Sequence, residues 1–256
     1  MTRLLEGRTV LVTGLITTAS IGFHVAAEAQ RAGATVLLTG YGRLGLVERM
    51  ARRLPSPTPV VELDVTDETQ LDSLADRLGE YTDHLDGLLH SIAYAPDSAL
   101  GGNFLRTPWT DVATTLRTST YSLQALTGAV LPLLRQGNSP GVVGMDFDAA
   151  TAWAGYDWMG VAKAGLESTA RYLARYLGQH GIRVNLVAAG PLRTSAARTL
   201  LSTGDGTHWS ELAPLGWDET DATSTARACV ALLSDWFPAT TGEIVHVDGG
   251  VHAMGR

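Results

Sequence analysis

One tyrosine and one lysine stand out in the segment "GYDWMGVAKAGLES", residues 155–168, because both can donate hydrogen bonds to a polar ligand. If the segment is helical, the seven positions from Tyr156 to Lys163 advance the chain about 10 Å and turn it through roughly 700°. Both side chains then lie on nearly the same face, two turns apart, and can address one ligand. Such a pair is also typical of the edge of a core on an amphipathic helix, so the rest of the chain must decide.

The composition is typical of a globular protein. The 256 residues are 45% hydrophobic and 18% charged, which predicts a single domain over residues 1–256. The net charge of -7 argues against broad binding to nucleic acid or to anionic membranes. We find neither a signal peptide nor a run of the roughly 20 apolar residues that a membrane span needs. The lone cysteine, Cys229, fits a reducing compartment, so we expect a cytoplasmic protein.

Short β-branched runs recur along the chain, each followed by a helical pattern. The runs are apolar on both faces rather than alternating, as expected for strands of a parallel sheet that helices cover on both sides. This alternation predicts right-handed crossovers and a doubly wound, Rossmann-type α/β fold of about seven strands. The expected strands are 9–14, 35–40, 59–65, 85–93, 141–147, 182–190 and 243–250, and the expected helices are 21–32, 67–80, 112–135, 157–179 and 221–234.

The first strand runs into "TGLITTASIGFHVAAEA", residues 13–29, which has glycines at 14 and 22 but lacks the compact G-x-G-x-x-G pattern. In a doubly wound sheet, ligands bind outside the carboxyl ends of the strands, where the strand order reverses. The segment leaves an expected strand and opens an expected helix, whose N-terminal N–H groups could hold a pyrophosphate. Ser20 could cap that helix or bind the phosphate, and both roles stay open.

The second strand ends in "TGYGRL" without the carboxylate that usually accepts the ribose hydroxyls of a dinucleotide. Tyr41 could instead cover the adenine, and Arg43 could meet a phosphate. Asp64, after the third strand, is a candidate for the adenine amino group, because Thr66 or Asp67 more naturally caps the following helix. The fourth strand ends in "HSIAYA", whose small side chains would let a flat ring approach the backbone.

Together these segments resemble the short-chain dehydrogenase/reductase superfamily and, within it, the enoyl-acyl-carrier-protein reductases, nearly end to end. Ordinary members of the superfamily use Tyr-x-x-x-Lys with a serine upstream, whereas Gly160 and Val143 stand at those positions here. The longer Tyr–Lys spacing resembles the enoyl reductase branch, most of all its actinobacterial members. The other segments that carry the resemblance are "HSIAYAP", "VGMDFD", "NLVAAGPLRT" and "ATTGEIVHVDGG".

The resemblance implies a role for each member of the pair. Tyr156 would hydrogen-bond the thioester carbonyl of a trans-2-enoyl substrate, and Lys163 would hold the nicotinamide ribose hydroxyls. Hydride transfer to the β-carbon puts negative charge on the thioester oxygen, and a phenol beside a cationic lysine stabilises that enolate. The implied activity is NADH-dependent reduction of an enoyl thioester, carried on acyl carrier protein or CoA, in fatty-acid synthesis or a specialised pathway.

The resemblance also implies a cofactor site and an acyl site. Phe147 matches an aromatic position that shapes the acyl site, with plain core packing as an equal alternative. Only Arg43 could meet a 2′-phosphate near the second strand, which favours NADH over NADPH. The implied cofactor-binding residues are Gly14, Ser20, Ile21, Tyr41, Asp64, Val65, Ser91, Ile92, Ala93, Lys163, Leu192 and Thr194, and the implied substrate-binding residues are Tyr94, Phe147, Tyr156, Met159, Ala196 and Leu200.

The segment 194–217 is expected to cover the acyl site. Ala196 and Leu200 could offer an apolar helical face to a lipid chain, and Gly204 and Gly206 could act as hinges of a lid. A surface helix packed on the core is the alternative. The segment is shorter than its counterpart in long-chain relatives, so we predict short-to-medium acyl chains as the preferred substrates.

Two other functions remain open. An ordinary short-chain dehydrogenase would act on a ketone or alcohol, but the absent serine and the longer Tyr–Lys spacing count against it. A catalytically silent relative would bind nucleotide or a partner protein, but the retained pair counts against it. His24 and His90 have no Cys/His/Asp cluster around them in the sequence, so no metal site is expected. Since the family forms homotetramers, Trp236 and Phe237 could serve subunit contacts.

Overall fold

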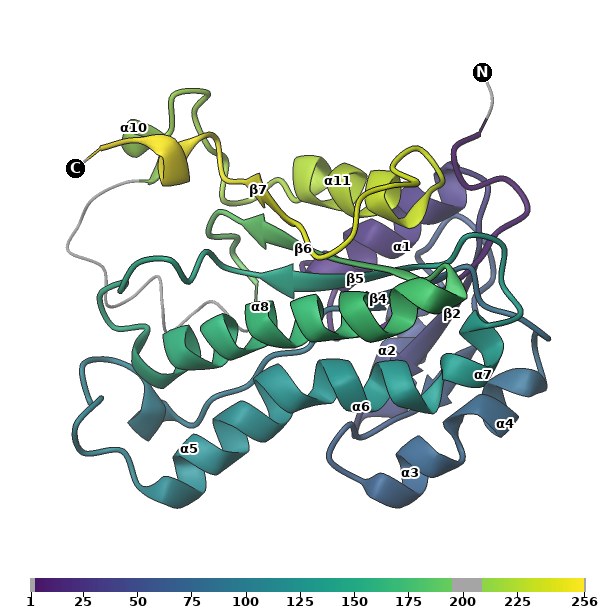
Figure 1. Cartoon of the computed structure of the whole chain (residues 1–256), viewed down its shortest axis with the longest axis horizontal. Helices are drawn as coiled ribbons and strands as arrows, with labels where there is room; N and C mark the ends of the chain where they lie inside the picture. The colour runs from purple at the N-terminus through teal and green to yellow at the C-terminus, as the bar shows by residue number, and fades with distance from the viewer. Residues whose placement is uncertain (1–2, 195–208, 256) are drawn as a thin grey trace.

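A computed structural model describes residues 3–194 and 209–255 of the chain. Its centre is one sheet of seven strands in the order β3-β2-β1-β4-β5-β6-β7, all of them parallel (Figure 1). The predicted doubly wound α/β fold of a single domain is therefore confirmed. The strands are β1 (Thr9–Val12), β2 (Thr35–Gly40), β3 (Val60–Glu62), β4 (Gly87–His90), β5 (Gly141–Asp146), β6 (Arg183–Ala189) and β7 (Ile244–Val247).

The strand order reverses between β1 and β4. The chain moves outward from β1 through β2 to β3, and then returns so that β4 pairs with the other side of β1, with Val10 opposite Gly87. The loops that follow β1 and β4 therefore leave the sheet side by side at its C-terminal edge. This is the place where doubly wound sheets bind their ligands.

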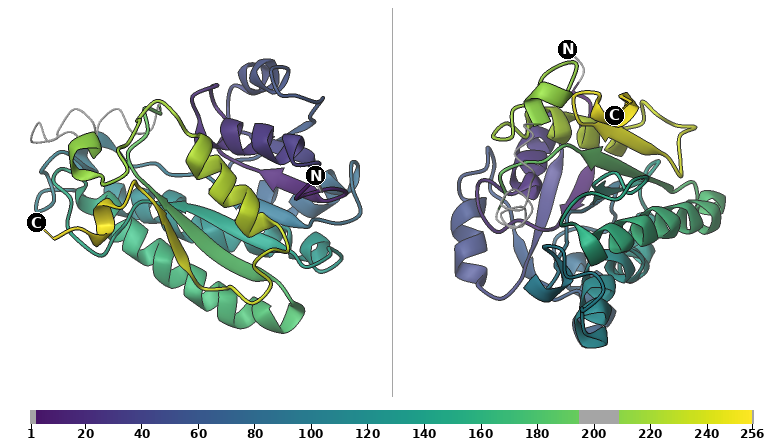
Figure 2. Two further views of the ribbon diagram at one scale, coloured as in Figure 1. Left: turned by 90° about the horizontal axis from the view of Figure 1, so that it is seen from above. Right: turned by 90° about the vertical axis from the view of Figure 1, so that its left-hand side faces the viewer.

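Helices cover both faces of the sheet (Figure 2). The helices α1 and α11 lie together on one face, and α6 and α8 lie on the other. Neighbouring residues of β1 serve the two layers in turn, because Val10 and Val12 pack with α1 while Leu11 packs with α6. Principal helices are α1 (Ile21–Arg31), α2 (Leu44–Ala51), α6 (Ser122–Ala129), α8 (Asp157–Leu177), α10 (Trp209–Leu212) and α11 (Thr223–Leu233).

The helix expected over 67–80 is two short helices, α3 (Glu68–Asp72) and α4 (Leu74–Gly79), which meet at Ser73. The Ser73 hydroxyl donates to the Thr69 carbonyl at 3.0 Å, a local bond that competes with the regular helix. Asp67 caps α3 by accepting from the backbone N–H groups of Thr69 and Gln70. The expectation that Thr66 or Asp67 caps this helix is thus confirmed for Asp67.

The helix expected over 112–135 is also interrupted. The chain forms α5 (Trp109–Leu116), a π-helical turn at Arg117–Tyr121, α6, and then α7 (Leu131–Leu134). Within the π turn, the Ser119 hydroxyl accepts from the Tyr94 N–H and donates to the Tyr94 carbonyl, both at 2.9 Å. The Thr120 hydroxyl donates to the Ala162 carbonyl of α8 at 2.7 Å. The side chains of this turn therefore bond both to the loop after β4 and to the first third of α8.

Among residues 3–194 and 209–255, no helix combines the length and the hydropathy that crossing a membrane requires.

Candidate active site

The helix α8 carries the tyrosine and lysine, and both side chains are buried: Tyr156 is 4% exposed and Lys163 is 5% exposed. Tyr156 is the N-cap residue of the helix. Asp157 fixes this start, because its Oδ2 accepts from the N–H groups of Gly102 and Asn103 at 2.6 and 2.9 Å. These bonds hold Asp157 at a φ of 44°, a left-handed conformation that a residue with a Cβ adopts only when its surroundings impose it.

The end of β5 contacts both members of the pair. The Lys163 ammonium donates to the Met145 carbonyl at 2.8 Å. Two residues later, the Phe147 ring meets the Tyr156 ring edge to face, with 5.1 Å between the centroids. The tyrosine and lysine predicted from their spacing therefore converge on three consecutive residues, 145–147, at the C-terminal edge of the sheet.

Burial controls the charge of both groups. It raises the pKa of the Tyr156 phenol, and the nearby Asp146 carboxylate raises it further, so the phenol is a neutral hydrogen-bond donor. Burial lowers the pKa of the Lys163 ammonium, while Asp146 acts in the opposite direction. The protonation of Lys163 thus depends on the balance between burial and this one carboxylate.

Asp146 is a functional candidate that our sequence analysis did not single out. Its side chain is 6% exposed, and neither carboxyl oxygen has a hydrogen bond of regular geometry among the described residues. Burial raises the pKa of its carboxyl group to about 7, and the charge of Lys163 limits the rise. The available signal was a carboxylate at the end of the apolar strand in "VGMDFD".

The Phe147 ring links Tyr156 to two tryptophans. Phe147 lies 5.2 Å from the Trp153 ring and 5.8 Å from the Trp209 ring, measured between centroids. Met159 is buried against Tyr156 from the next turn of α8. Phe147 therefore both packs in this cluster and borders the phenol, and its sequence-based assignment to the acyl site stays a prediction. Tyr94, another of the implied substrate-binding residues, is exposed after β4.

The glycines after β1 make room where two strand ends converge. Gly14 has a φ of 78°, and a Cβ built on it would lie 1.8 Å from the Ser91 carbonyl oxygen after β4. A Cβ on Gly22 would lie 2.7 Å from the Thr13 carbonyl oxygen, so glycine also lets α1 start directly against the strand. A bare backbone leading into a helix N-terminus is the arrangement that accepts a pyrophosphate. Both close approaches are to the protein's own backbone, so the glycines place the helix N-terminus at the strand ends, and their contact with a dinucleotide stays a prediction.

Ser20 occupies the N-cap position of α1, but its side chain makes no capping hydrogen bond. Its hydroxyl oxygen instead accepts from the N–H groups of Ile16 and Thr17 at 3.1 and 3.0 Å. Of the two roles left open for Ser20, its place at the N-cap is confirmed, but its side chain forms no capping bond because the hydroxyl is used by the preceding loop. A phosphate contact from Ser20 stays a prediction.

The expected adenosine residues lie after β2 and β3. Asp64 accepts at one oxygen from both the N–H and the hydroxyl of Thr66, at 2.8 and 2.7 Å, so part of its capacity serves the local turn. Val65 is buried in the core, whereas Tyr41 and Arg43 are exposed at the end of β2. The role of these residues toward adenine stays a prediction.

The other predicted residues lie at the same edge or outside the described residues. Ser91 and Ile92 are half-buried and Ala93 is exposed in the loop after β4, Ile21 is half-buried at the start of α1, and Leu192 is buried after β6. Thr194 is half-buried and donates from its N–H to the Leu192 carbonyl. Ala196 and Leu200, with most of the expected lid 194–217, lie outside the described residues.

His90 is buried at the end of β4, with Nε2 2.8 Å from the Ser122 hydroxyl. Burial and, to a smaller extent, the charge of Lys163 lower the pKa of its imidazole to about 3, so the ring is neutral. Across residues 3–194 and 209–255, no group of three His, Cys, Asp or Glu side chains could hold a metal ion.

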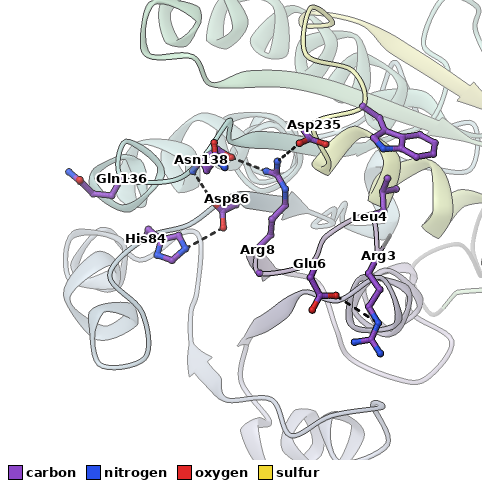
Figure 3. Close-up of a pocket in the computed structure, with 11 residues that line it drawn as sticks. Arg3, Leu4, Glu6, Arg8, His84, Asp86, Gln136, Asn138 and Asp235 are labelled. Carbon is purple, nitrogen blue, oxygen red and sulfur yellow. Dashed lines mark hydrogen bonds and ion pairs between the residues drawn. The ribbon is translucent and has the colours of Figure 1, made fainter. Parts of the chain in front are cut away.

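The opposite, N-terminal edge of the sheet holds a second set of charged residues around a cavity of about 580 Å³ (Figure 3). Asp86, just before β4, accepts from the N–H groups of Thr9 and Asn138 at 2.8 and 2.7 Å. Arg8 donates to the Asn138 carbonyl at 2.8 Å and lies 3.4 Å from Asp235. This cavity is remote from Tyr156 and Lys163, and its polar groups bind one another.

Comparisons with known proteins agree with this geometry. Residues 14–252 match the family model described as "Enoyl-(Acyl carrier protein) reductase". The enoyl-[acyl-carrier-protein] reductase [NADH] of Mycolicibacterium smegmatis is 48% identical over 98% of this chain and 98% of its own length. The proteins of the same name from Mycobacterium avium and Escherichia coli are 45% and 32% identical, over 98% and 96% of this chain and 98% and 94% of their own lengths.

Proposed function

The chain belongs to the enoyl-acyl-carrier-protein reductase family of the short-chain dehydrogenases, and we propose that it reduces the trans-2 double bond of an enoyl thioester with NADH. The observation that carries the proposal is the convergence of Tyr156 and Lys163 on the end of β5. Both are buried donors on one helix, beside the glycine-lined loop at which we expect the dinucleotide.

When bound, the nicotinamide supplies the hydride for the β-carbon. Tyr156 donates from its neutral phenol to the thioester oxygen, where negative charge develops. The enolate then takes up a proton at the α-carbon, ultimately from solvent, to give the saturated thioester. Lys163 donates to the ribose hydroxyls and adds a positive charge near that oxygen. Tyr156 is 4% exposed and packs against Phe147, and this burial strengthens the hydrogen bond of the phenol to the developing enolate.

Turnover of crotonyl thioester and of a 3-ketoacyl thioester, each with NADH and with NADPH, tests the proposal. We expect reduction of the enoyl thioester with NADH. Preferential reduction of the ketoacyl thioester would instead indicate an ordinary short-chain dehydrogenase. NADH binding without turnover of either substrate would indicate a silent nucleotide-binding relative.

Replacement of the phenol tests its role. Tyr156→Phe should lower kcat for crotonyl thioester roughly a hundredfold, because it removes a donor to the transition-state oxygen. Tyr172→Phe is the matched control, since Tyr172 lies on the same helix and is exposed. Equal turnover in the two variants would contradict the assignment.

The remaining parts of the proposal concern the acyl chain. We propose that the substrate is carried by acyl carrier protein, as the names of the relatives suggest, and that short-to-medium chains are preferred. A series of kcat/KM values should rise with chain length and then level off, since each methylene contributes roughly 0.8 kcal/mol only while it has protein to contact. A continued rise into very long chains would contradict this preference.

We also propose a cytoplasmic homotetramer. Trp236 and Phe237 are 72% and 42% exposed, more than large apolar side chains usually are without a partner. Cys229 is a buried free thiol, as is common in a reducing compartment. Light scattering of the wild type and of a Trp236→Ser variant tests the assembly, and a monomeric wild type would refute it.

A further inference from the structure

A buried carboxyl group without a regular hydrogen bond lies directly beside the residue that holds Lys163. Nearly all buried polar groups in proteins are hydrogen-bonded, so an exception needs a functional explanation. Asp146 is 6% exposed, and neither of its oxygens has a hydrogen bond of regular geometry among the described residues. The Phe147 N–H lies near enough to lower the pKa of the carboxyl group slightly, but burial outweighs it. Met145, the preceding residue, provides the carbonyl that accepts from Lys163 at 2.8 Å.

The two charges interact without direct contact. Among the described residues, Lys163 and Asp146 form no ion pair within 4.0 Å, and the ammonium is directed to the Met145 carbonyl instead. A buried ammonium that lacks an opposing charge tends to lose its proton. For Lys163, burial drives this loss, and the charge of Asp146 is what counters it.

The other titratable groups near the pair do not replace Asp146. His90 on β4 is neutral because burial lowers the pKa of its ring to about 3. Cys229 on α11, whose Sγ lies 3.5 Å from the Met145 Sδ, is neutral because burial raises the pKa of its thiol to about 12. Tyr156 is neutral as well, since burial raises the pKa of its phenol. No negative charge comes from these three directions.

Two further carboxylates are engaged elsewhere. Glu167 on α8 accepts from the Ala149 N–H at 3.2 Å and lies 3.9 Å from Arg171. Asp148, after β5, accepts from the Ala150 N–H at 3.0 Å and lies 3.8 Å from His246 on β7. Both act on Asp146 by raising the pKa of its carboxyl group, but neither is a source of the shift at Lys163.

We propose that Asp146 is a positioning residue that keeps Lys163 cationic, so that cofactor affinity stays constant through neutral and mildly alkaline pH. This inference rests on the proposed function, because it takes Lys163 as the group that holds the ribose hydroxyls. Burial raises the pKa of Asp146 to about 7. The carboxylate therefore forms around neutral pH, and from there upward its charge opposes the loss of the Lys163 proton. As the pH rises, Asp146 loses its proton first, and Lys163 stays protonated.

The test is the NADH dissociation constant, measured by fluorescence from pH 6.5 to pH 9. The dissociation constant of the wild type should stay constant within about threefold over this range. Asp146→Asn should match wild type at pH 6.5 and bind about tenfold more weakly at pH 9, because its Lys163 becomes neutral. Asp76→Asn is the control, since it removes an exposed carboxylate on α4 that is no source of the pKa shifts at Asp146 or Lys163, and it should follow wild type. A uniform loss of affinity at every pH in Asp146→Asn would indicate a structural role and overturn the inference.

Calorimetry in buffers of different ionisation enthalpy provides a second measurement that needs no variant. At pH 8.5, NADH binding to wild type should take up almost no proton, because Lys163 is already charged. Uptake of about one proton by wild type would overturn the inference while leaving the proposed function standing. A wild type that binds no NADH at any pH would refute the proposed function itself, and the inference with it.

Discussion

Two buried carboxylates stand at opposite edges of the same sheet and differ in what surrounds them. Asp86 at the N-terminal edge is 2% exposed, and its oxygens accept from the backbone N–H groups of Thr9 and Asn138. Figure 3 shows its contact with Asn138. Asp146 at the C-terminal edge is 6% exposed, and its oxygens have no hydrogen bond of regular geometry among the described residues. Both carboxylates are buried, but of the two only Asp86 accepts regular hydrogen bonds from the described residues. At the N-terminal edge the buried carboxylate stabilises the fold through its hydrogen bonds, whereas at the C-terminal edge the buried carboxylate can still accept hydrogen bonds from a ligand.

The comparison extends to the cations. Arg183, the first residue of β6, donates to the carbonyls of Leu232 and Ser234, both at 2.8 Å. Arg8 likewise donates to Asn138 and lies near Asp235. Within residues 3–194 and 209–255, Lys163 at the other edge donates to one carbonyl, although an ammonium can donate three bonds. Changes at the N-terminal edge should therefore affect stability, and changes at the C-terminal edge should affect binding.

The largest expected effect is on the stability of Asp86→Ala. The change leaves the buried N–H groups of Thr9 and Asn138 unpaired, and each such group costs roughly 1–3 kcal/mol, so we expect a loss of about 4 kcal/mol in the free energy of unfolding. Urea denaturation measures it. Asp83→Ala, which removes an exposed carboxylate nearby, should change the stability by less than about 0.5 kcal/mol. A similar small loss in both variants would break the comparison.

Lys163→Met should produce the complementary result. The change keeps the apolar stem but removes the charged donor, so NADH affinity should fall by about a hundredfold, or roughly 3 kcal/mol. The free energy of unfolding should be unchanged or higher, because a buried cation is lost. Calorimetry with NADH and urea denaturation measure the two quantities. A large loss of stability with unchanged affinity would show that Lys163 is structural.

The sequence predicts the central strands well because the apolar runs of β1, β4, β5 and β6 are buried at every residue, a property of the run itself. It predicts the tyrosine and lysine because helical geometry fixes their relative position. The π turn escapes prediction, because the groups its hydroxyls bind, at Tyr94 and Ala162, lie far along the chain. The role of Asp146 cannot be predicted from the sequence either, because its surroundings also come from distant parts of the chain. That its carboxyl group lacks a regular hydrogen bond becomes visible only once α8 and the neighbouring strands have packed around it.

Asp146→Asn should stabilise the protein at high pH. The folded pKa of about 7 lies above the ordinary value of 3.8, so ionisation of this buried carboxyl group costs stability as the pH rises from about 4 to about 7. At roughly 1.4 kcal/mol per pKa unit, the variant should gain about 2–3 kcal/mol over wild type between pH 5 and pH 8. Urea denaturation at both pH values measures the gain. An unchanged difference would mean that a group within the protein satisfies the carboxylate.

His90 should act in the opposite direction and with the smallest effect. Its folded pKa of about 3 lies below the ordinary 6.5, so the unfolded chain gains a proton that the folded protein excludes, and stability falls as the pH drops below 6.5. Between pH 7.5 and pH 5.5, wild type should lose about 1.4 kcal/mol relative to His90→Asn, whereas His180→Asn, at an exposed histidine, should follow wild type.

Between about pH 4 and pH 6.5 the loss of stability caused by His90 opposes the gain of stability caused by protonation of Asp146. Asp146→Asn removes that gain, so its free energy of unfolding should fall more steeply with acid than that of wild type. Parallel acid profiles would show that the two buried groups do not oppose each other.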